Sequence, residues 1–198
     1  MRCKAIAVPL DAQSTKKEIE YVINDCRPDI VFISEDKLGM FSDLELQGAR
    51  LMTKNDVVLS DDPNIPATDI PMGKDDETML INYTSGTTGN PKGVMLSFRN
   101  VMFNVDSVSK QVPIFQENSN VMVLLPLHHI LPLLGSMVAP LYMGGTLHIA
   151  EAMNAESIIK TLNAGKVSII IGVPRLYDML VKGIMSKINA SVVTRLLY

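Results

Sequence analysis

The sequence predicts an α/β fold of mostly parallel sheets flanked by helices. Short apolar runs alternate with segments of helical periodicity along nearly the whole chain. Hydrophobic residues make up 47% and charged residues 20%, which is typical of a domain with a buried core. The net charge of −3 offers no electrostatic basis for binding nucleic acid.

Residues 1–59 are predicted to form a βαβ lobe. A buried strand over 5–10 precedes a helix, for which Thr15 and Glu18 are placed as a capping box. The spacing i, i+3, i+4, i+7 predicts the buried face of this helix at Ile19, Val22, Ile23 and Cys26. The elements expected after it are a strand at 29–33, a short helix at 37–47 and a strand at 56–59.

Residues 60–77 are predicted to be an exposed connection, because three prolines and six acidic residues interrupt any periodicity. Residues 78–198 then form a second lobe of the same domain. Its predicted strands are 78–83, 121–125, 145–150 and 167–171. Its predicted helices are 100–111, 131–143, 155–164 and one from Pro174 to about Lys187.

The loop after strand 78–83 has the most distinctive composition of the chain. Residues 83–94 spell YTSGTTGNPKGV, with three glycines that let the backbone approach a ligand closely. Its donors are the hydroxyls of Thr84, Ser85, Thr87 and Thr88 and the ammonium of Lys92. So many donors are more consistent with a loop that binds a polyphosphate than with a polar turn that binds no ligand. Neither the Walker A pattern nor G-x-G-x-x-G is present, so the loop belongs to neither class.

This loop resembles the phosphate-binding motif of the adenylate-forming superfamily, which includes acyl-CoA synthetases, luciferase and the adenylation domains of peptide synthetases. Other segments are similar to the same enzymes, namely AIAVPLDAQ and VLLPLHHILPLLGSMVAPLYMGGTLHI. The segment VPRLYDMLVKGI is similar to the long-chain fatty acyl-CoA synthetase branch.

The resemblance implies an ATP-dependent fatty acid–CoA ligase, of which this chain would be part of the large N-terminal domain. In such an enzyme a carboxylate attacks the α-phosphate of ATP, and the thiol of coenzyme A then displaces AMP. ATP with Mg²⁺ and coenzyme A would be the cofactor and co-substrate. The implied phosphate contacts are Thr84, Ser85, Gly86, Thr87, Thr88, Gly89 and Lys92. His129 matches the histidine of the "LPLFH" segment near the acyl pocket and the nucleotide, and Val173 and Pro174 match the acyl-pocket wall.

Two departures from the family pattern limit what this chain can do. Phe98 stands where relatives commonly have the histidine of "SHxN". The "YGxTE" segment, the ribose-binding aspartate and the C-terminal domain with its catalytic lysine do not occur. We therefore expect a fragment that holds no catalytic residue or metal ligand, is inactive alone, and has the remainder of its own chain as a partner.

Two other functions stay open at this point. The first is another adenylating ligase, specific for a short-chain or aromatic acid or for an amino acid. The second is a non-catalytic module that only binds nucleotide. Two cysteines, Cys3 and Cys26, are too few for a disulfide framework, so we expect reduced thiols and a cytoplasmic location. A lipid substrate would also be compatible with peripheral membrane contact.

Overall fold

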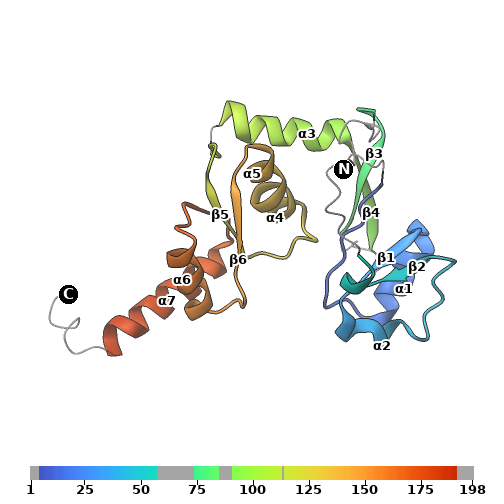
Figure 1. The fold of residues 1–198 in the computed structure, drawn as a ribbon, viewed down its shortest axis with the longest axis horizontal. Coiled ribbons are helices and arrows are strands. Elements are labelled where there is room, and N and C mark those ends of the chain that lie inside the picture. The colour runs from blue at the N-terminus through green and yellow to red at the C-terminus, as the bar shows by residue number, and fades with distance from the viewer. Residues whose placement is uncertain (1–4, 58–73, 85–90, 113, 191–198) are drawn as a thin grey trace. The chain divides into compact units, whose positions relative to one another are not determined.

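The computed structural model describes residues 5–57, 74–84, 91–112 and 114–190 (Figure 1). Contacts within the chain divide it into two compact units, Met1–Leu96 and Ser97–Tyr198. The division therefore falls after Leu96, whereas most of the predicted connection at 60–77 lies outside the described residues.

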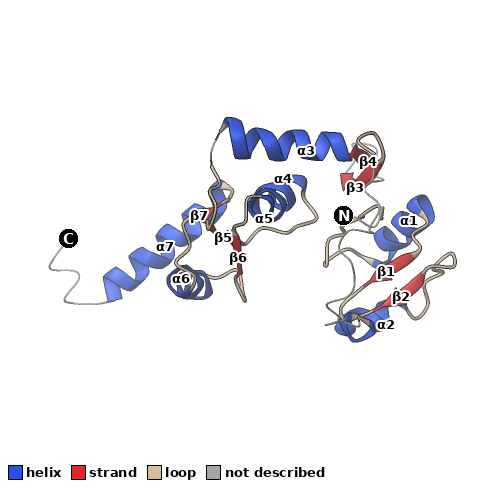
Figure 2. Cartoon of the chain, turned by 45° about the horizontal axis from the view of Figure 1, so that its top comes forward, coloured by secondary structure: helices blue, strands red, loops and turns tan. Residues whose placement is uncertain are grey.

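The first unit is built from two strand pairs and two helices. Its helices are α1 (Lys16–Cys26) and α2 (Leu38–Phe41), with single 3₁₀ turns at η1 (Glu35–Lys37) and η2 (Lys54–Asp56). Its strands are β1 (Ile30–Phe32), β2 (Arg50–Met52), β3 (Thr78–Thr84) and β4 (Lys92–Ser97). β1 pairs with β2 in parallel, and β3 pairs with β4 (Figure 2).

Helix α1 begins where the sequence predicts. The Glu18 N–H donates to Thr15 Oγ1 at 3.4 Å, and the Thr15 N–H donates to the Glu18 carboxylate at 2.7 Å, which confirms the capping box. These bonds hold the pKa of Glu18 below its usual value. The buried face of α1 packs Ile19 and Ile23 against Phe41, so the short helix α2 closes over α1.

Two predictions for the first lobe are wrong in detail. The helix predicted at 37–47 ends at Phe41, and the chain then turns through Gln47 and Gly48, whose φ angles of 51° and 88° lie in the left-handed region. Residues 56–57 are not in a strand, and residues 58–59 of the strand predicted at 56–59 lie outside the described residues. The strand that pairs with β1 is instead β2 at Arg50–Met52. Residues 54–56 form a 3₁₀ turn, because Thr53 and Asp56 bond each other's backbone and side chain locally.

The strand predicted at 5–10 is reduced to one parallel bridge, between Ala7 and Leu80 of β3. The Ala7 N–H donates to the Met79 carbonyl at 3.0 Å, and the Ile81 N–H donates to the Ala7 carbonyl at 2.9 Å. The segment around Ala7 therefore supports one edge of β3.

The second unit holds a three-stranded parallel sheet with helices packed on it. Its strands are β5 (Asn120–Val123), β6 (Thr146–Ile149) and β7 (Ile169–Ile170), in the order β6-β5-β7. Its helices are α3 (Phe98–Asp106), α4 (Ile130–Pro132), α5 (Ala139–Tyr142), α6 (Ala155–Ala164) and α7 (Pro174–Ala190). π-helical turns η3 (Ser107–Gln111) and η4 (Leu133–Val138) extend α3 and join α4 to α5.

The core of the second unit forms around the central strand β5. Val121 and Met122 are fully buried, as expected for a parallel strand covered on both faces. Met122 packs with Ile158 of α6 and with Leu176 and Leu180 of α7. This confirms the alternation of strands and helices that the sequence predicts from residue 121 onward.

The helix predicted at 131–143 is present but not regular. It runs as α4, η4 and α5 from Ile130 to Tyr142, with a π-helical turn in the middle. Pro140 lies in the first turn of α5 and has no N–H to donate to the turn before it. The wider π-helical turn lies just before Pro140, where the missing N–H interrupts the regular hydrogen-bond ladder of the helix.

Candidate functional site

Thr84 and Lys92 are the two predicted phosphate contacts that the structure describes. Thr84 is the last residue of β3 and Lys92 is the first residue of β4. Because these strands pair and only residues 85–91 separate them, they are too close in sequence for the crossover of roughly a dozen residues that parallel strands need. The pair is therefore a hairpin, which brings Thr84 and Lys92 to the same end. The other predicted contacts, Ser85, Gly86, Thr87, Thr88 and Gly89, lie outside the described residues.

β3 is anchored in the first unit by buried side chains and becomes exposed at the end that carries Thr84. Leu80 is 1% exposed and Asn82 is buried as well, whereas Thr84 is exposed. Lys92 is exposed too, and no carboxylate within the described parts of the chain forms an ion pair with it. An exposed ammonium without a protein counter-ion can serve an anionic ligand.

β4 is the part of this site that sequence reasoning missed. Residues 92–94 belong to the predicted loop at 83–94, and no element is predicted for residues 95–97. Val94 and Met95 are 44% and 68% exposed, so β4 lacks the buried alternation that would have predicted a strand. The signal that could have found it is the β-branched and apolar run Val94-Met95-Leu96 directly after the glycine-rich loop.

The second unit carries the other predicted site residues. His129 is the N-cap residue of α4 and is exposed, and its ring centroid lies 4.1 Å from that of His128. Pro174 is the first residue of α7, and Val173 before it is 43% exposed. The location of Pro174 confirms the predicted helix start.

His129 and Pro174 belong to the same edge of the β6-β5-β7 sheet. β5 and β7 are parallel neighbours, and each of the two residues follows the carboxyl end of one of them. In open α/β sheets this edge is the usual place for ligands. Gly135 of η4 lies against Ile171, since an added Cβ would be 2.7 Å from Ile171 Cδ1, so the segments after β5 and β7 are in contact.

Two further features bear on ligands. Within the described residues, no group of three His, Cys, Asp or Glu side chains could hold a metal ion, and no helix is long and apolar enough to cross a bilayer.

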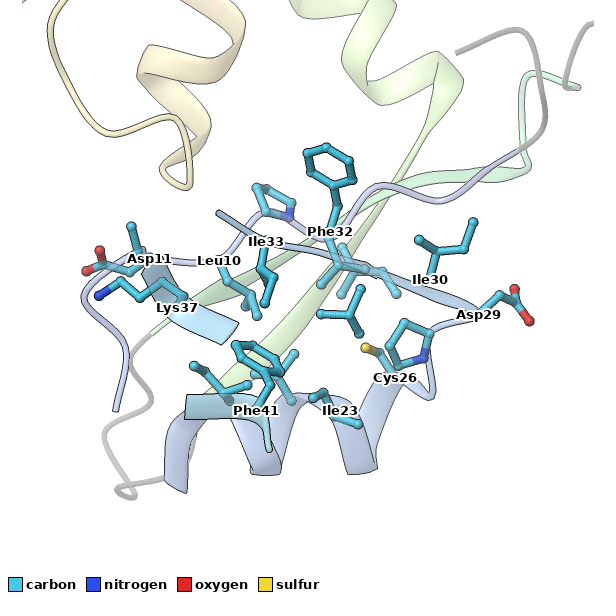
Figure 3. A pocket seen from close by; sticks show the side chains of 18 of the residues that line it. Leu10, Asp11, Ile23, Cys26, Asp29, Ile30, Phe32, Ile33, Lys37 and Phe41 are labelled. Carbon is cyan, nitrogen blue, oxygen red and sulfur yellow. The ribbon is translucent and has the colours of Figure 1, made fainter. Parts of the chain in front are cut away.

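The first unit also has a mostly apolar pocket of about 760 Å³ between the segment before α1, helix α1 and strand β1 (Figure 3). Asp11 and Lys37 lie at one side of it, and neither Thr84 nor Lys92 lines it.

With this geometry in place, comparison with known proteins identifies the class. The chain belongs to the AMP-binding enzyme family, whose model matches residues 1–196. This is the family of adenylate-forming ligases that the glycine-rich loop predicts. Thr84 at the end of β3 and Lys92 at the start of β4 therefore flank the loop that resembles the phosphate-binding motif of this family.

Individual relatives differ in the acid that their names give. The chain is 31% identical to long-chain-fatty-acid–CoA ligase 1 of Schizosaccharomyces pombe, across 95% of this chain and 25% of that protein. It is 28% identical to the mitochondrial malonate–CoA ligase ACSF3 of Mus musculus, across 88% of this chain and 31% of that protein. The chain thus spans between a quarter and a third of the length of these relatives.

Solved structures have the same fold. The N-terminal domain of FACL13 from Mycobacterium tuberculosis matches with a TM-score of 0.73 at 22% identity, over 89% of this chain and 45% of that one. ATP-bound MatB from Rhodopseudomonas palustris matches with a TM-score of 0.71 at 25% identity, over 88% of this chain and 35% of that one. These matches confirm the predicted α/β fold.

Proposed function

We propose that this chain supplies the polyphosphate-binding part of an ATP-dependent fatty acid–CoA ligase. The observation that carries the proposal is the β3–β4 pair, which presents Thr84 and Lys92 at the two ends of the loop TSGTTGNPK. Membership of the AMP-binding enzyme family supports it. The proposed reaction needs ATP with Mg²⁺ and coenzyme A, and the ATP-bound MatB structure supports the nucleotide.

In the proposed reaction the substrate carboxylate attacks the α-phosphate of ATP. The P–O bond to the β-phosphate breaks, and pyrophosphate leaves with the electron pair. Thr84 and Lys92 would bind the β- and γ-phosphates and offset the charge that grows on pyrophosphate. The thiol of coenzyme A then attacks the acyl carbon, and AMP leaves. Positioning and charge neutralisation supply most of the acceleration, so no acid–base side chain is required of this part of the chain.

We propose that the second unit binds the carboxylic-acid substrate. His129 and Pro174 follow the carboxyl ends of adjacent parallel strands, where the carboxylate and its alkyl chain would lie. Long-chain acids are favoured by the similarity to the S. pombe enzyme. Malonate is the second candidate, because the similarity to the malonate–CoA ligase is nearly as high.

Acid-dependent ATP–pyrophosphate exchange by the whole protein tests the proposal. We expect exchange with palmitate and none with malonate. Exchange with malonate but not with palmitate would favour malonate, the second candidate, as the substrate. No exchange with any carboxylic acid, in a protein that still binds ATP, would support a non-catalytic nucleotide-binding module instead.

The 198-residue chain by itself should not form an acyl-adenylate, because the motifs expected for the adenine and Mg²⁺ contacts are not among its residues. Release of pyrophosphate by the isolated chain in the presence of a fatty acid would contradict this.

We also propose a reducing compartment such as the cytoplasm, with peripheral contact to a membrane that supplies a lipid substrate. Fractionation of cells that express the tagged whole protein tests both.

A further inference from the structure

Tyr83 links the phosphate-loop hairpin to helix α1. It precedes Thr84 at the end of β3, and its hydroxyl donates to Asp25 Oδ2 at 2.6 Å. Asp25 lies in the last turn of α1, far away in sequence. The bond therefore joins two elements of the first unit within one residue of a predicted phosphate contact.

Asp25 has no favourable role within its own helix. A carboxylate in the last turn faces the negative end of the helix dipole, and α1 has no basic residue in that turn to offset it. Local helix stability would favour a neutral or basic residue here. The hydrogen bond from the Tyr83 hydroxyl is an interaction that does favour an acid at this position.

Gly93 makes room for the Tyr83 ring on the other strand. A Cβ added at Gly93 would be 3.1 Å from Tyr83 Cζ and 2.9 Å from Ile81 Cγ2, closer than side chains normally pack. Gly93 directly follows Lys92 on β4. The aromatic ring therefore lies against the backbone beside Lys92, while its hydroxyl is held by α1.

The environment keeps Tyr83 a neutral donor. Burial raises the pKa of its hydroxyl, and the hydrogen bond to Asp25 and the nearby Cys26 raise it further. Burial also raises the pKa of the Cys26 thiol, which lines the wall of the pocket in Figure 3. Both groups stay protonated at neutral pH, so the link does not depend on titration there.

We propose that Tyr83, held by Asp25, is a positioning residue that fixes Thr84 and Lys92 for polyphosphate binding. Its ring sets the distance between β4 and α1, and its hydroxyl prevents the end of β3 from moving away from α1. This inference rests on the proposed function, because it assigns a role to a residue that does not itself touch the phosphates.

The test uses pyrophosphate and MgATP binding to the 198-residue chain by calorimetry, with Tyr83→Phe, Asp25→Asn and the double variant. We expect each single variant to weaken pyrophosphate binding about tenfold, and the double variant to bind no more weakly than either single one. Gly93→Ala, which displaces the ring, should give a loss of similar size.

Tyr177→Phe is the matched control, because its hydroxyl also donates to a distant group, the Ile170 carbonyl at 3.3 Å, but in the second unit. Thermal unfolding is measured on every variant, and binding is compared only where all are folded. Tyr177→Phe should leave binding unchanged. A merely structural role of Tyr83 would lower the unfolding temperature without changing the dissociation constant.

Two outcomes overturn the inference in distinguishable ways. If the wild type binds pyrophosphate and Tyr83→Phe binds it equally well, the positioning role is wrong and the proposed function stands. If the folded wild type binds neither pyrophosphate nor MgATP, the phosphate site itself is wrong, and the positioning role fails with it.

Discussion

The β3–β4 pair and the β6-β5-β7 sheet use their strands differently. β5 is buried along most of its length, with Val121 and Met122 at 0% exposure, and its neighbours are both parallel. β4 is exposed from Lys92 to Met95, and its strand partner is the hairpin neighbour β3. The sheet thus stabilises the second unit through burial, whereas the hairpin displays strand ends that can meet a ligand. Stability and binding should therefore respond to different substitutions.

The largest expected effect is on the stability of the second unit. Ile158→Ala removes a side chain that is 0% exposed and packs on Met122, so we expect the free energy of unfolding to fall by roughly 2–5 kcal/mol. Denaturant unfolding followed by circular dichroism measures it. Ile184→Ala, at a site that is 46% exposed, is the matched control and should cost much less. Equal losses in the two variants would mean that the Met122 cluster is not the core.

In the β3–β4 hairpin, a substitution should weaken ligand binding strongly and change stability little. Lys92→Ala removes a charged contact of the kind that contributes roughly 1.5–3 kcal/mol, so pyrophosphate should bind about ten- to a hundredfold more weakly. Because Lys92 is exposed, the free energy of unfolding should change by less than about 0.5 kcal/mol. Calorimetry and denaturant unfolding give the two numbers. Lys160→Ala, which removes an exposed lysine paired with Glu151, should leave binding unchanged.

A packing defect at the sheet edge sharpens the same comparison. Gly165 follows α6, and a Cβ there would collide with the ring of His148, whose Nε2 is 3.0 Å from Asn120 Oδ1. Gly165→Ala should therefore lower the free energy of unfolding by roughly 1–3 kcal/mol, with pyrophosphate binding retained. Gly39→Ala is the control, because nothing lies within 4 Å of its added Cβ. A Gly165→Ala variant as stable as Gly39→Ala would show that His148 can move aside freely.

The smallest effect concerns alkaline pH and the first unit. The pKa values of Cys26 and Tyr83 are raised above their ordinary values of 9.0 and 10.0, so the folded state holds these protons more tightly than the unfolded state. Their contribution to stability is complete below about pH 9 and is lost as pH rises beyond it. Chemical unfolding from pH 7 to 10.5 should show this decline, and Tyr83→Phe should reduce it. An equal decline in wild type and variant would exclude Tyr83 as a source.

The sequence predicted the second unit better than the first. The 3.6-residue period of 155–164 matches α6 to the residue, since Ile158 faces a core that local pattern can reveal. The capping box of Thr15 and Glu18 was also visible, because it depends on residues three positions apart. β2 and β4 were missed because short strands carry little pattern of their own and form only through their partners.

The candidate site shows the same limit. The composition of the loop at 83–94 predicts Thr84 and Lys92 as phosphate contacts, and this stays a prediction. The structure adds that Thr84 ends β3 and Lys92 begins its partner β4. Nothing in the sequence could indicate that Asp25 reaches Tyr83, because 58 positions separate them and only tertiary packing brings them together. Long-range hydrogen bonds of this kind leave no local pattern.

The central claim is that the ends of β3 and β4 bind the phosphates of ATP. The most direct test follows backbone amide resonances of the isotope-labelled chain as pyrophosphate and then MgATP are added. We predict that Thr84 and Lys92 shift with both ligands, in proportion to the fraction bound, while amides of the buried sheet such as Met122 do not. A folded chain whose Thr84 and Lys92 resonances stay unchanged at saturating pyrophosphate would contradict the account.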